Sequence, residues 1–314
     1  ERLLAAGPEF GGFLSNHGPM VVEVLAHHGF TDEIHPWLDR YEQRLEPRPR
    51  GGSRVHDWHA ALGDAGRLGD WLDHFDDEMQ SREWRDVLAT WWPRLVPGIA
   101  AAATHGVIRV GHAVRALDDA DTAVRRRELG SALASWAARY RLIPTSRPAG
   151  VAGADDALAT VPTVAGQTGG VVDRVAQLAT TPGWHDALQS LQMTADPEAH
   201  LTRTADVATA AARRYVTHGH GNGVMLVHAV TAPTAVLRSM PVLARDHWEV
   251  SADYAWSAAA ALHAAYASPS GRAVEVPQLD PSELMARAVE HGDEHVIKLA
   301  DAAIDAFERT ADPT

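Results

Sequence analysis

Four histidines lie inside apolar segments whose spacing is typical of helices. The segments are SNHGPM, THGVIRVGHAV, VHAVTAP and DEHVIKLA, and their histidines include His17, His105, His228 and His295. A buried neutral imidazole costs free energy unless its ring nitrogens find partners, and a single one is usually a paired core residue. Four on separate predicted helices indicate a shared site, because helical bundles build metal centres from inward side chains of facing helices. The pattern predicts one buried transition-metal site.

Lys298 is the only lysine among 28 lysine and arginine residues, and it follows His295 by three positions on an apolar helical face. Side chains at that spacing share a face. A protonated lysine is a poor ligand, but a buried one can lose its proton, and its neutral amine can add carbon dioxide. The resulting carbamate is an anionic oxygen donor. Four imidazoles and such an anion would suit iron(II) better than magnesium or calcium. The alternative is a lysine whose stem covers apolar surface while its amine reaches water.

Other polar residues near these segments are weaker candidates for the site. Arg109 stands one turn after His105, where it could bind a phenolate or superoxide, or pair with an acid. His112 rivals His105 as a ligand, because residues seven apart fall on one helical face and the sequence does not separate them. His291 could support His295, although an exposed position is the simpler expectation. The remaining histidines considered are expected in solvent or in a polar turn: His27, His28, His35, His56, His59, His74, His218 and His220.

The composition favours an all-α protein. The chain has 314 residues, of which 46% are hydrophobic, and abundant alanine with few β-branched runs predicts a multi-helix bundle enclosing a metal and substrate cavity. We expect one domain over residues 1–314. The net charge of −13 argues against nucleic acid and anionic membranes as partners. The absence of cysteine excludes disulfides and thiolate ligands. No basic, apolar leader is visible and 96–114 reads as core, so we expect a cytoplasmic protein.

Helix signals recur along most of the chain. Ser15 or Asn16 is predicted to cap the first helix, and Thr31 to begin the second. The segment 144–170, rich in Pro, Gly, Ala and Thr, is predicted to be a flexible loop or lid. The predicted helices span 15–28, 65–80, 83–104, 107–117, 121–142, 171–189, 197–216, 224–240, 246–267 and 281–309.

Four of these motifs together carry a family resemblance. In their order along nearly the whole chain, SNHGPM, HGVIRVGHAV, VHAVTAPTAVLR and DEHVIKLADA resemble the questin oxidase-like family of polyketide-tailoring enzymes. Enzymes of that family oxidatively cleave a ring of anthraquinones, in a Baeyer–Villiger-like or dioxygenase-like step. At least one member is understood to hold non-haem iron with four histidines and a carboxylated lysine. The resemblance implies metal ligation by His17, His105, His228, His295 and Lys298.

The sequence therefore supports one leading hypothesis and two alternatives. The first is a non-haem Fe(II)-dependent oxygenase that uses O2 to open a ring of an anthraquinone-like or other polycyclic aromatic polyketide. Because no GxGxxG follows a strand and no P-loop is present, any reductant such as NADPH would come from outside. The alternatives are a zinc-type metallohydrolase with a carbamylated lysine, and a non-catalytic helical binding protein whose histidines satisfy one another.

Overall fold

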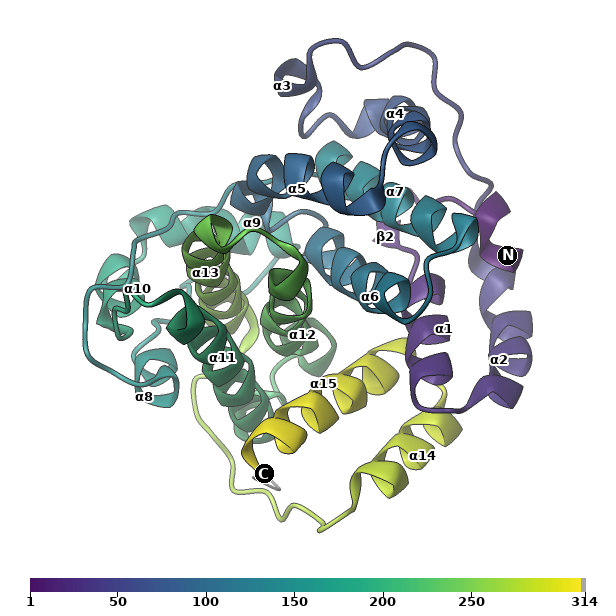
Figure 1. The fold of residues 1–314 in the computed structure, drawn as a ribbon. Helices are drawn as coiled ribbons and strands as arrows, with labels where there is room; N and C mark the ends of the chain where they lie inside the picture. Colours follow the sequence, from purple (N-terminus) through teal and green to yellow (C-terminus); the bar gives the residue numbers. More distant parts are fainter. Residues whose placement is uncertain (312–314) are drawn as a thin grey trace. The chain divides into compact units, whose positions relative to one another are not determined.

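The fold is all-α, as the composition predicted. A computed structural model describes residues 1–311, and in that range it contains the helices α1 to α15 and one two-stranded sheet (Figure 1). The sheet pairs β1 (Glu9–Phe10) with β2 (Leu14–Ser15) in antiparallel fashion, and β2 leads directly into the first histidine segment.

The chain divides into two compact units. The first unit comprises Glu1–Leu142 with Met285–Lys298, and the second comprises Ile143–Leu284 with Leu299–Thr314. In the first unit α7 packs against both α4 and α6, and α6 packs against α1. The α-helices that lie wholly in it are α1 (Gly18–His27), α2 (Ile34–Tyr41), α3 (Trp58–Ala61), α4 (Leu68–Ser81), α5 (Trp84–Leu95), α6 (His105–Asp119) and α7 (Ala123–Ala138).

In the second unit α11, α12 and α13 pack against one another. The helices are α8 (Ala154–Ala159), α9 (Val171–Ala176), α10 (Trp184–Ser190), α11 (Pro197–His218), α12 (Gly223–Ser239) and α13 (Trp248–Tyr266). The segment Gly223–Val242 is, among the described residues, the one long and apolar enough to cross a membrane by length and composition. Most of it is buried inside the protein, and core helices of soluble proteins pass the same test. In the apolar stretch 96–114, the side chains of Val96, Ile99 and Val107 are buried in the core.

The predicted helix over 281–309 is wrong as a single element. It is two helices, α14 (Pro281–His291) and α15 (Glu294–Thr310), separated by Gly292 with a φ of 77°. Glycine adopts this left-handed conformation without a steric cost and commonly ends helices. The carboxylate of Asp293 then accepts hydrogen bonds from the backbone N–H groups of His295 at 2.8 Å and Val296 at 3.3 Å. This capping starts α15 anew and fixes the orientation of its first turn.

The predicted helix over 83–104 also ends early. α5 stops at Leu95, and Ala102, Ala103 and Thr104 all have positive φ angles, of 46°, 56° and 70°. Such a run is costly for residues with a Cβ and persists only where packing around it enforces it. α6 begins at His105, two residues before the predicted start of the helix over 107–117.

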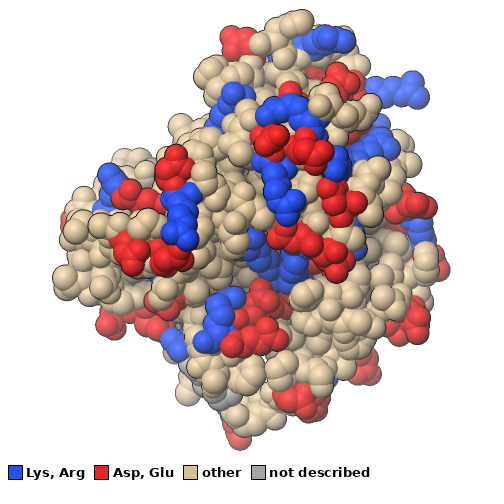
Figure 2. All heavy atoms as spheres, in the orientation of Figure 1, with Lys and Arg blue, Asp and Glu red and all other residues tan. Residues whose placement is uncertain are grey.

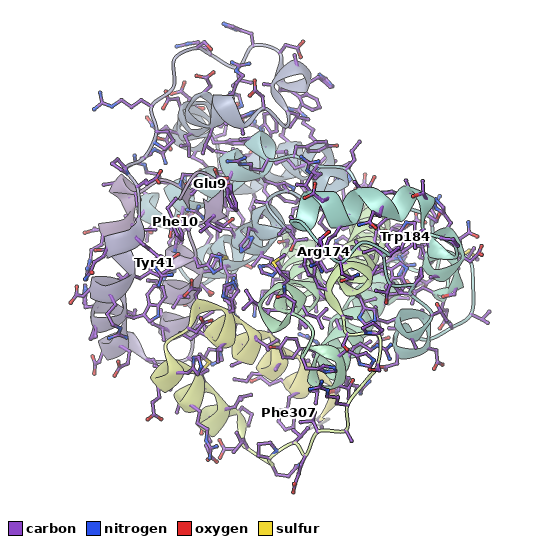
Figure 3. All side chains as sticks on the ribbon, turned by 180° about the vertical axis from the view of Figure 1, so that it is seen from behind. Glu9, Phe10, Tyr41, Arg174, Trp184 and Phe307 are labelled. Atoms are coloured by element: carbon purple, nitrogen blue, oxygen red, sulfur yellow. The ribbon has the colours of Figure 1, made fainter. Side chains whose placement is uncertain are left out.

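The segment 144–170 is more ordered than its composition suggests. The segment 171–189 is not one continuous helix. The segment 144–170 contains α8, and the Gly150 N–H donates to the Leu191 carbonyl at 3.1 Å. Trp184, labelled in Figure 3, donates from Nε1 to the Pro144 carbonyl at 3.1 Å. The helix predicted over 171–189 is split into α9 and α10, with Gly183 at a φ of 80° just before α10.

The surface carries many acidic groups that are paired with arginine. Figure 2 shows acidic side chains interspersed with basic ones on the face drawn. In the first unit, for example, Arg85 lies 2.7 Å from Asp118 and Arg126 lies 2.6 Å from Asp121. Exposed pairs of this kind contribute little to stability. The net negative charge therefore bears on solubility and on the choice of partners more than on the stability of the fold.

Candidate metal centre

His17 lies at the junction between β2 and α1, where its backbone is tightly held. Its side chain is only 5% exposed. The predicted cap residue Asn16 donates from Nδ2 to the Gly7 carbonyl at 2.9 Å and accepts from the Gly18 N–H at 2.9 Å, although the helix N-cap itself is His17. The His17 N–H donates to the hydroxyl oxygen of Tyr41 at 2.6 Å, and Figure 3 labels this tyrosine on α2. These contacts fix the direction in which His17 enters the site.

His105 begins α6 directly after the left-handed run. Its Nδ1 lies 2.5 Å from the Ala102 carbonyl, so the turn that precedes the helix also orients the ring. The next residue, Gly106, packs against Trp136 of α7 so closely that a Cβ there would lie 2.6 Å from the indole Cγ. Glycine is therefore required for the first turn of α6 to approach α7, and this approach places His105.

His295 and Glu294 lie in the first turn of α15. Trp37 of α2 donates from Nε1 to the Gly292 carbonyl at 2.9 Å, and Arg44 donates to the Glu294 carboxylate at 3.2 Å. The carboxylate of Asp293 lies 3.4 Å from Nδ1 of His295. Metal-binding histidines commonly have such a carboxylate behind the ring, which sets the tautomer and leaves the other nitrogen for the ion.

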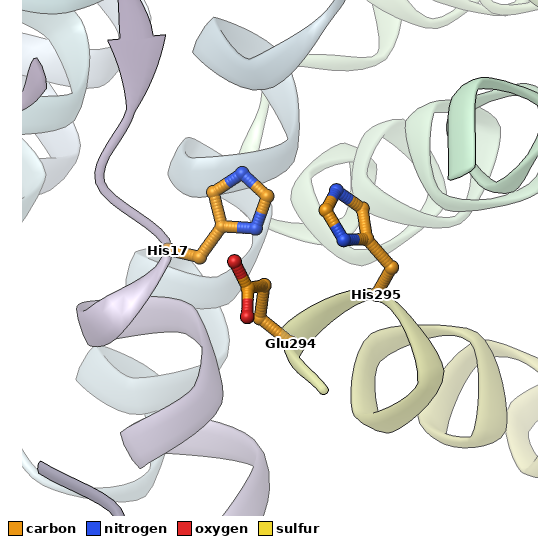
Figure 4. A group of neighbouring side chains, drawn as sticks. All are labelled: His17, Glu294 and His295. Atoms are coloured by element: carbon orange, nitrogen blue, oxygen red, sulfur yellow. The ribbon is translucent and has the colours of Figure 1, made fainter. Parts of the chain in front are cut away.

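The structure brings the side chains of His17, His105 and His295 together. The ring centroid of His17 lies 4.6 Å from that of His105 and 4.7 Å from that of His295. The candidate ligand atoms of His17, Glu294 and His295 all lie within 4.8 Å of one another. Figure 4 shows these three side chains turned toward one another from the β2–α1 junction and the start of α15. Segments far apart in the sequence thus supply imidazoles and a carboxylate to one small volume.

Lys298 is buried beside this cluster. It is 1% exposed, and its Nζ has no hydrogen-bond partner among the described residues. Burial lowers the pKa of the Lys298 amine to about 7, although the nearby carboxylates of Glu294 and Asp293 oppose the shift. Burial also lowers the pKa values of His105 and His295, and the charge of Lys298 lowers them further. Neutral imidazole, the form that binds a metal, is therefore favoured at both positions.

These residues fit a divalent transition metal. The candidate donors are imidazole nitrogens of His17 and His295 and a carboxylate oxygen of Glu294, with the His105 ring beside that of His17. Nitrogen and oxygen donors of this kind would suit iron or zinc better than an ion that prefers only oxygen. A buried amine without a partner, such as that of Lys298, requires an explanation in a folded protein. Carboxylation would convert it into an oxygen donor and would remove its positive charge.

Gly106→Ala tests how far the cluster depends on the contact between α6 and α7. The added methyl group must displace Trp136 or the helix start, and overpacking of this kind typically costs about 1–3 kcal/mol of unfolding free energy. We expect reduced stability in urea together with weaker metal binding, because the first turn of α6 carries His105. The control is Gly153→Ala, where a Cβ meets nothing within 4 Å. Equal metal affinity in a destabilised Gly106→Ala variant would contradict the coupling.

The two histidines of α6 have different surroundings. His105 lies beside His17, whereas Nδ1 of His112 lies 2.7 Å from a carboxylate oxygen of Glu23. Arg109, between them, is paired with Glu128 through Nε at 2.5 Å and Nη2 at 2.9 Å. The structure therefore places His105 in the cluster and gives His112 and Arg109 carboxylate partners of their own.

His228 belongs to the second unit, so its role as the fourth imidazole stays a prediction. It lies on α12, is 1% exposed, and has its Nδ1 3.1 Å from the Met225 carbonyl. This contact favours a proton on Nδ1 and leaves Nε2 as the nitrogen able to bind a metal.

Sequence reasoning missed or misplaced several residues. Glu294 was not considered, although the Gly292–Asp293 pair just before it is a typical helix break and restart. His74 is not simply solvated, because its Nε2 is buried and its ring lies 5.3 Å from that of Trp91. His218 is buried rather than part of a polar turn. His291 is exposed, as expected.

Comparison of the chain with protein-family models, with curated proteins and with solved structures finds no match.

Proposed function

We propose that the chain is a non-haem iron-dependent oxygenase of the questin oxidase-like kind that its sequence resembles. Its substrates would be O2 and an anthraquinone-like or other polycyclic aromatic polyketide, and the reaction would open a ring by breaking a carbon–carbon bond. The observation that carries the proposal is the convergence of His17, His105 and His295 beside the buried amine of Lys298, which has no hydrogen-bond partner in the described part of the chain.

Each residue of the cluster would have a defined part. When bound, iron(II) supplies the redox chemistry with which O2 attacks an electron-rich ring. The imidazoles, with His228 as the fourth, would hold the ion in their neutral form. The neutral amine of Lys298 would bond through nitrogen to the carbon of CO2 and release a proton, and so give the site an anionic oxygen. Burial of His17 and Lys298 would limit the access of water to their side of the ion.

Glu294 supports a second candidate, a zinc-type metallohydrolase. Two imidazoles and one glutamate form the ligand set of many catalytic zinc sites, and Glu294 supplies the carboxylate beside His17 and His295. In that case Lys298 would serve as a further anionic ligand after carboxylation. The two candidates differ in the metal and in the need for O2.

Metal analysis of protein purified without a histidine tag tests both proposals. We expect roughly one iron per chain, as isolated or after anaerobic reconstitution, because the donors form one site. Oxygen uptake with a hydroxyanthraquinone, measured with and without NADPH, should then depend on the iron. Absence of any transition metal before and after reconstitution would rule out the site. A zinc protein that hydrolyses its substrate without consuming O2 would favour the second candidate.

A further inference from the structure

Two buried histidines and an arginine meet at the ends of α11 and α13 in the second unit. The ring centroids of His218 and His263 lie 6.0 Å apart, and the two residues are 8% and 5% exposed. Arg214, one turn before His218 on α11, donates from Nε to Nε2 of His263 at 3.3 Å. An imidazole nitrogen that accepts a hydrogen bond carries no proton, so this contact requires a neutral His263 with its proton on Nδ1.

This cluster of Arg214, His218 and His263 has no carboxylate to balance a further positive charge. In the described part of the chain, the one side-chain hydrogen bond of Arg214 is the one to His263, and burial alone lowers the pKa of the guanidinium. The carboxylates of α11 and α13 precede these residues by eight or more positions. The other charged or titratable groups on the elements packed here are His220, Arg272, Glu275, His228 and Arg238 of α12, Asp155 and Asp156 of α8, and Asp173 and Arg174 of α9.

The carboxylates among these groups act elsewhere. Asp155 pairs with Arg213 at 2.7 Å, and Asp173 accepts from the Gly170 N–H at the start of α9 at 3.0 Å. Asp156 and Glu275 are exposed. The sequence of α12 contains no acidic residue. Protonation of either buried histidine therefore adds an uncompensated cation beside Arg214.

The cluster holds both histidines in their neutral form. Burial lowers the pKa of His263 to about 3, and the charges of Arg214 and His218 act in the same direction. Burial, Arg214 and His220 likewise lower the pKa of His218. The C-terminus of a helix favours a positive charge, and both rings lie in the last turn of theirs, but burial and the neighbouring cation outweigh this effect.

The segment between α13 and α14, residues 268–280, is attached to the same end of α11. The Ser268 N–H donates to the His218 carbonyl at 3.0 Å, and the Arg272 N–H donates to the Thr217 carbonyl at 2.9 Å. These carbonyls belong to the last turn of α11, where no partner exists inside the helix. Gly271 lies so close to the His218 ring that a Cβ there would be 2.8 Å from Cε1.

Farther along, the α13–α14 segment forms one wall of an apolar pocket of about 250 Å³. The segment supplies Val276, Pro277 and Leu279. The other walls include Ala212 of α11 and Phe307 of α15, which is labelled in Figure 3. Detachment of the segment from α11 would therefore open this pocket as well as uncover the His218 ring.

We propose that the cluster is a pH-sensitive switch, in which protonation of His263 and His218 releases the α13–α14 segment from α11 and opens the apolar pocket. Protonation of His263 ends its hydrogen bond from Arg214 and sets cations against one another. Release of the segment admits water to the cluster, where the charged rings regain hydration. The switch involves no metal and is independent of the proposed function.

The sign follows from which form binds more protons. His263 has the lower pKa in the closed form, so the open form binds more protons and is favoured as the pH falls from about 6.5 towards about 3. With a pKa of about 3 when closed and 6.5 when open, His263 alone raises the ratio of open to closed molecules about twentyfold between pH 7 and pH 5.

The test is amide hydrogen exchange of the full chain at pH 7 and pH 5, followed by mass spectrometry and corrected for the intrinsic effect of pH on exchange. We expect the corrected exchange of residues 268–280 to rise about twentyfold at pH 5, and that of the buried helix α12 to stay unchanged.

Three variants identify the groups responsible. In the double variant His218→Gln, His263→Gln neither side chain titrates, and a glutamine oxygen can still accept from Arg214, so the acid response should disappear. Arg214→Met keeps both histidines and removes the opposing cation, so the response should become smaller. The matched control is His200→Gln, because His200 is a second buried histidine of α11 with a pKa lowered by burial, and it should keep the full response. Circular dichroism checks that each variant is folded.

Each alternative result has a definite meaning. An unchanged exchange of residues 268–280 at pH 5, or the same rise in the double variant as in the natural protein, would overturn the switch. A rise that spreads equally through α12 would also overturn it, because the whole unit would then unfold. If the double variant does not fold, Arg214→Met decides, and an undiminished acid response in that variant contradicts the proposal.

Discussion

Replacing Lys298 with arginine should abolish metal binding, although the substitution conserves the positive charge. Lys298 is the only lysine in the chain, it is 1% exposed, and its Nζ has no hydrogen-bond partner within residues 1–311. Its amine has a pKa of about 7 because of burial, so the neutral form that reacts with CO2 is accessible at neutral pH. The guanidinium of arginine stays protonated and cannot form a carbamate. Metal content measured by plasma spectrometry should fall by at least about tenfold, as expected for the loss of a ligand.

Three comparisons make this result specific. Lys298→Met keeps the length of an apolar stem in a buried site, so it should fold normally and still bind no metal. Lys298→Ala should recover part of its metal when acetate or propionate is added, because a free carboxylate can replace the missing oxygen donor. Bicarbonate should aid reconstitution of the natural protein but not of Lys298→Met or Lys298→Ala. If Lys298→Arg retained normal iron content and turnover, the carbamate proposal would fail, while a site of histidines alone would survive.

His105→Ala should lose its metal, whereas His112→Ala should keep it. The ring centroid of His105 lies 4.6 Å from that of His17, whereas Nδ1 of His112 lies 2.7 Å from a carboxylate oxygen of Glu23. Removing a ligand typically lowers metal affinity by about tenfold or more, and activity should fall with it. For His112→Ala we expect normal metal content, because His112 is paired with Glu23 and lies outside the cluster.

The same measurement of metal content applies to the other proposed ligands. His17→Ala and His295→Ala should behave like His105→Ala, and His228→Ala should do so if it supplies the fourth imidazole. His56→Ala is the matched control, since His56 is exposed. Full metal content in both the His105 and the His112 variants would show that the ligand set is wrong.

Much of the fold and the types of the site residues followed from local pattern. The all-α class came from alanine-rich, 3.6-residue periodicity, and α11 and α12 lie within two residues of their predicted bounds. His295 and Lys298 could be paired in advance because their spacing on one helix is a local property. The apolar surroundings of His17 likewise predicted its burial, whereas His105 is only partly buried.

The tertiary structure decided which of two histidines seven apart in one helical segment joins the cluster. Both fall on the same face of a helix, so periodicity treats them alike. The left-handed run Ala102–Thr104 and the contact of Gly106 with Trp136 set where α6 begins, and therefore where His105 lies. The contact between Gly106 and Trp136 joins residues 30 positions apart in the sequence, which no local pattern encodes.

Glu294 is a second case in which the sequence alone did not predict a residue of the cluster. A continuous helix over 281–309 is compatible with the residues on both sides of Gly292, but in the structure the glycine ends one helix and Asp293 caps the next. Trp37 of α2 holds that turn in place by donating a hydrogen bond to the Gly292 carbonyl. The sequence by itself determined a helical protein with buried imidazoles and one buried amine. The tertiary structure decided which carboxylate lies among them, because the approach of the first turn of α15 to His17 joins segments far apart in the sequence.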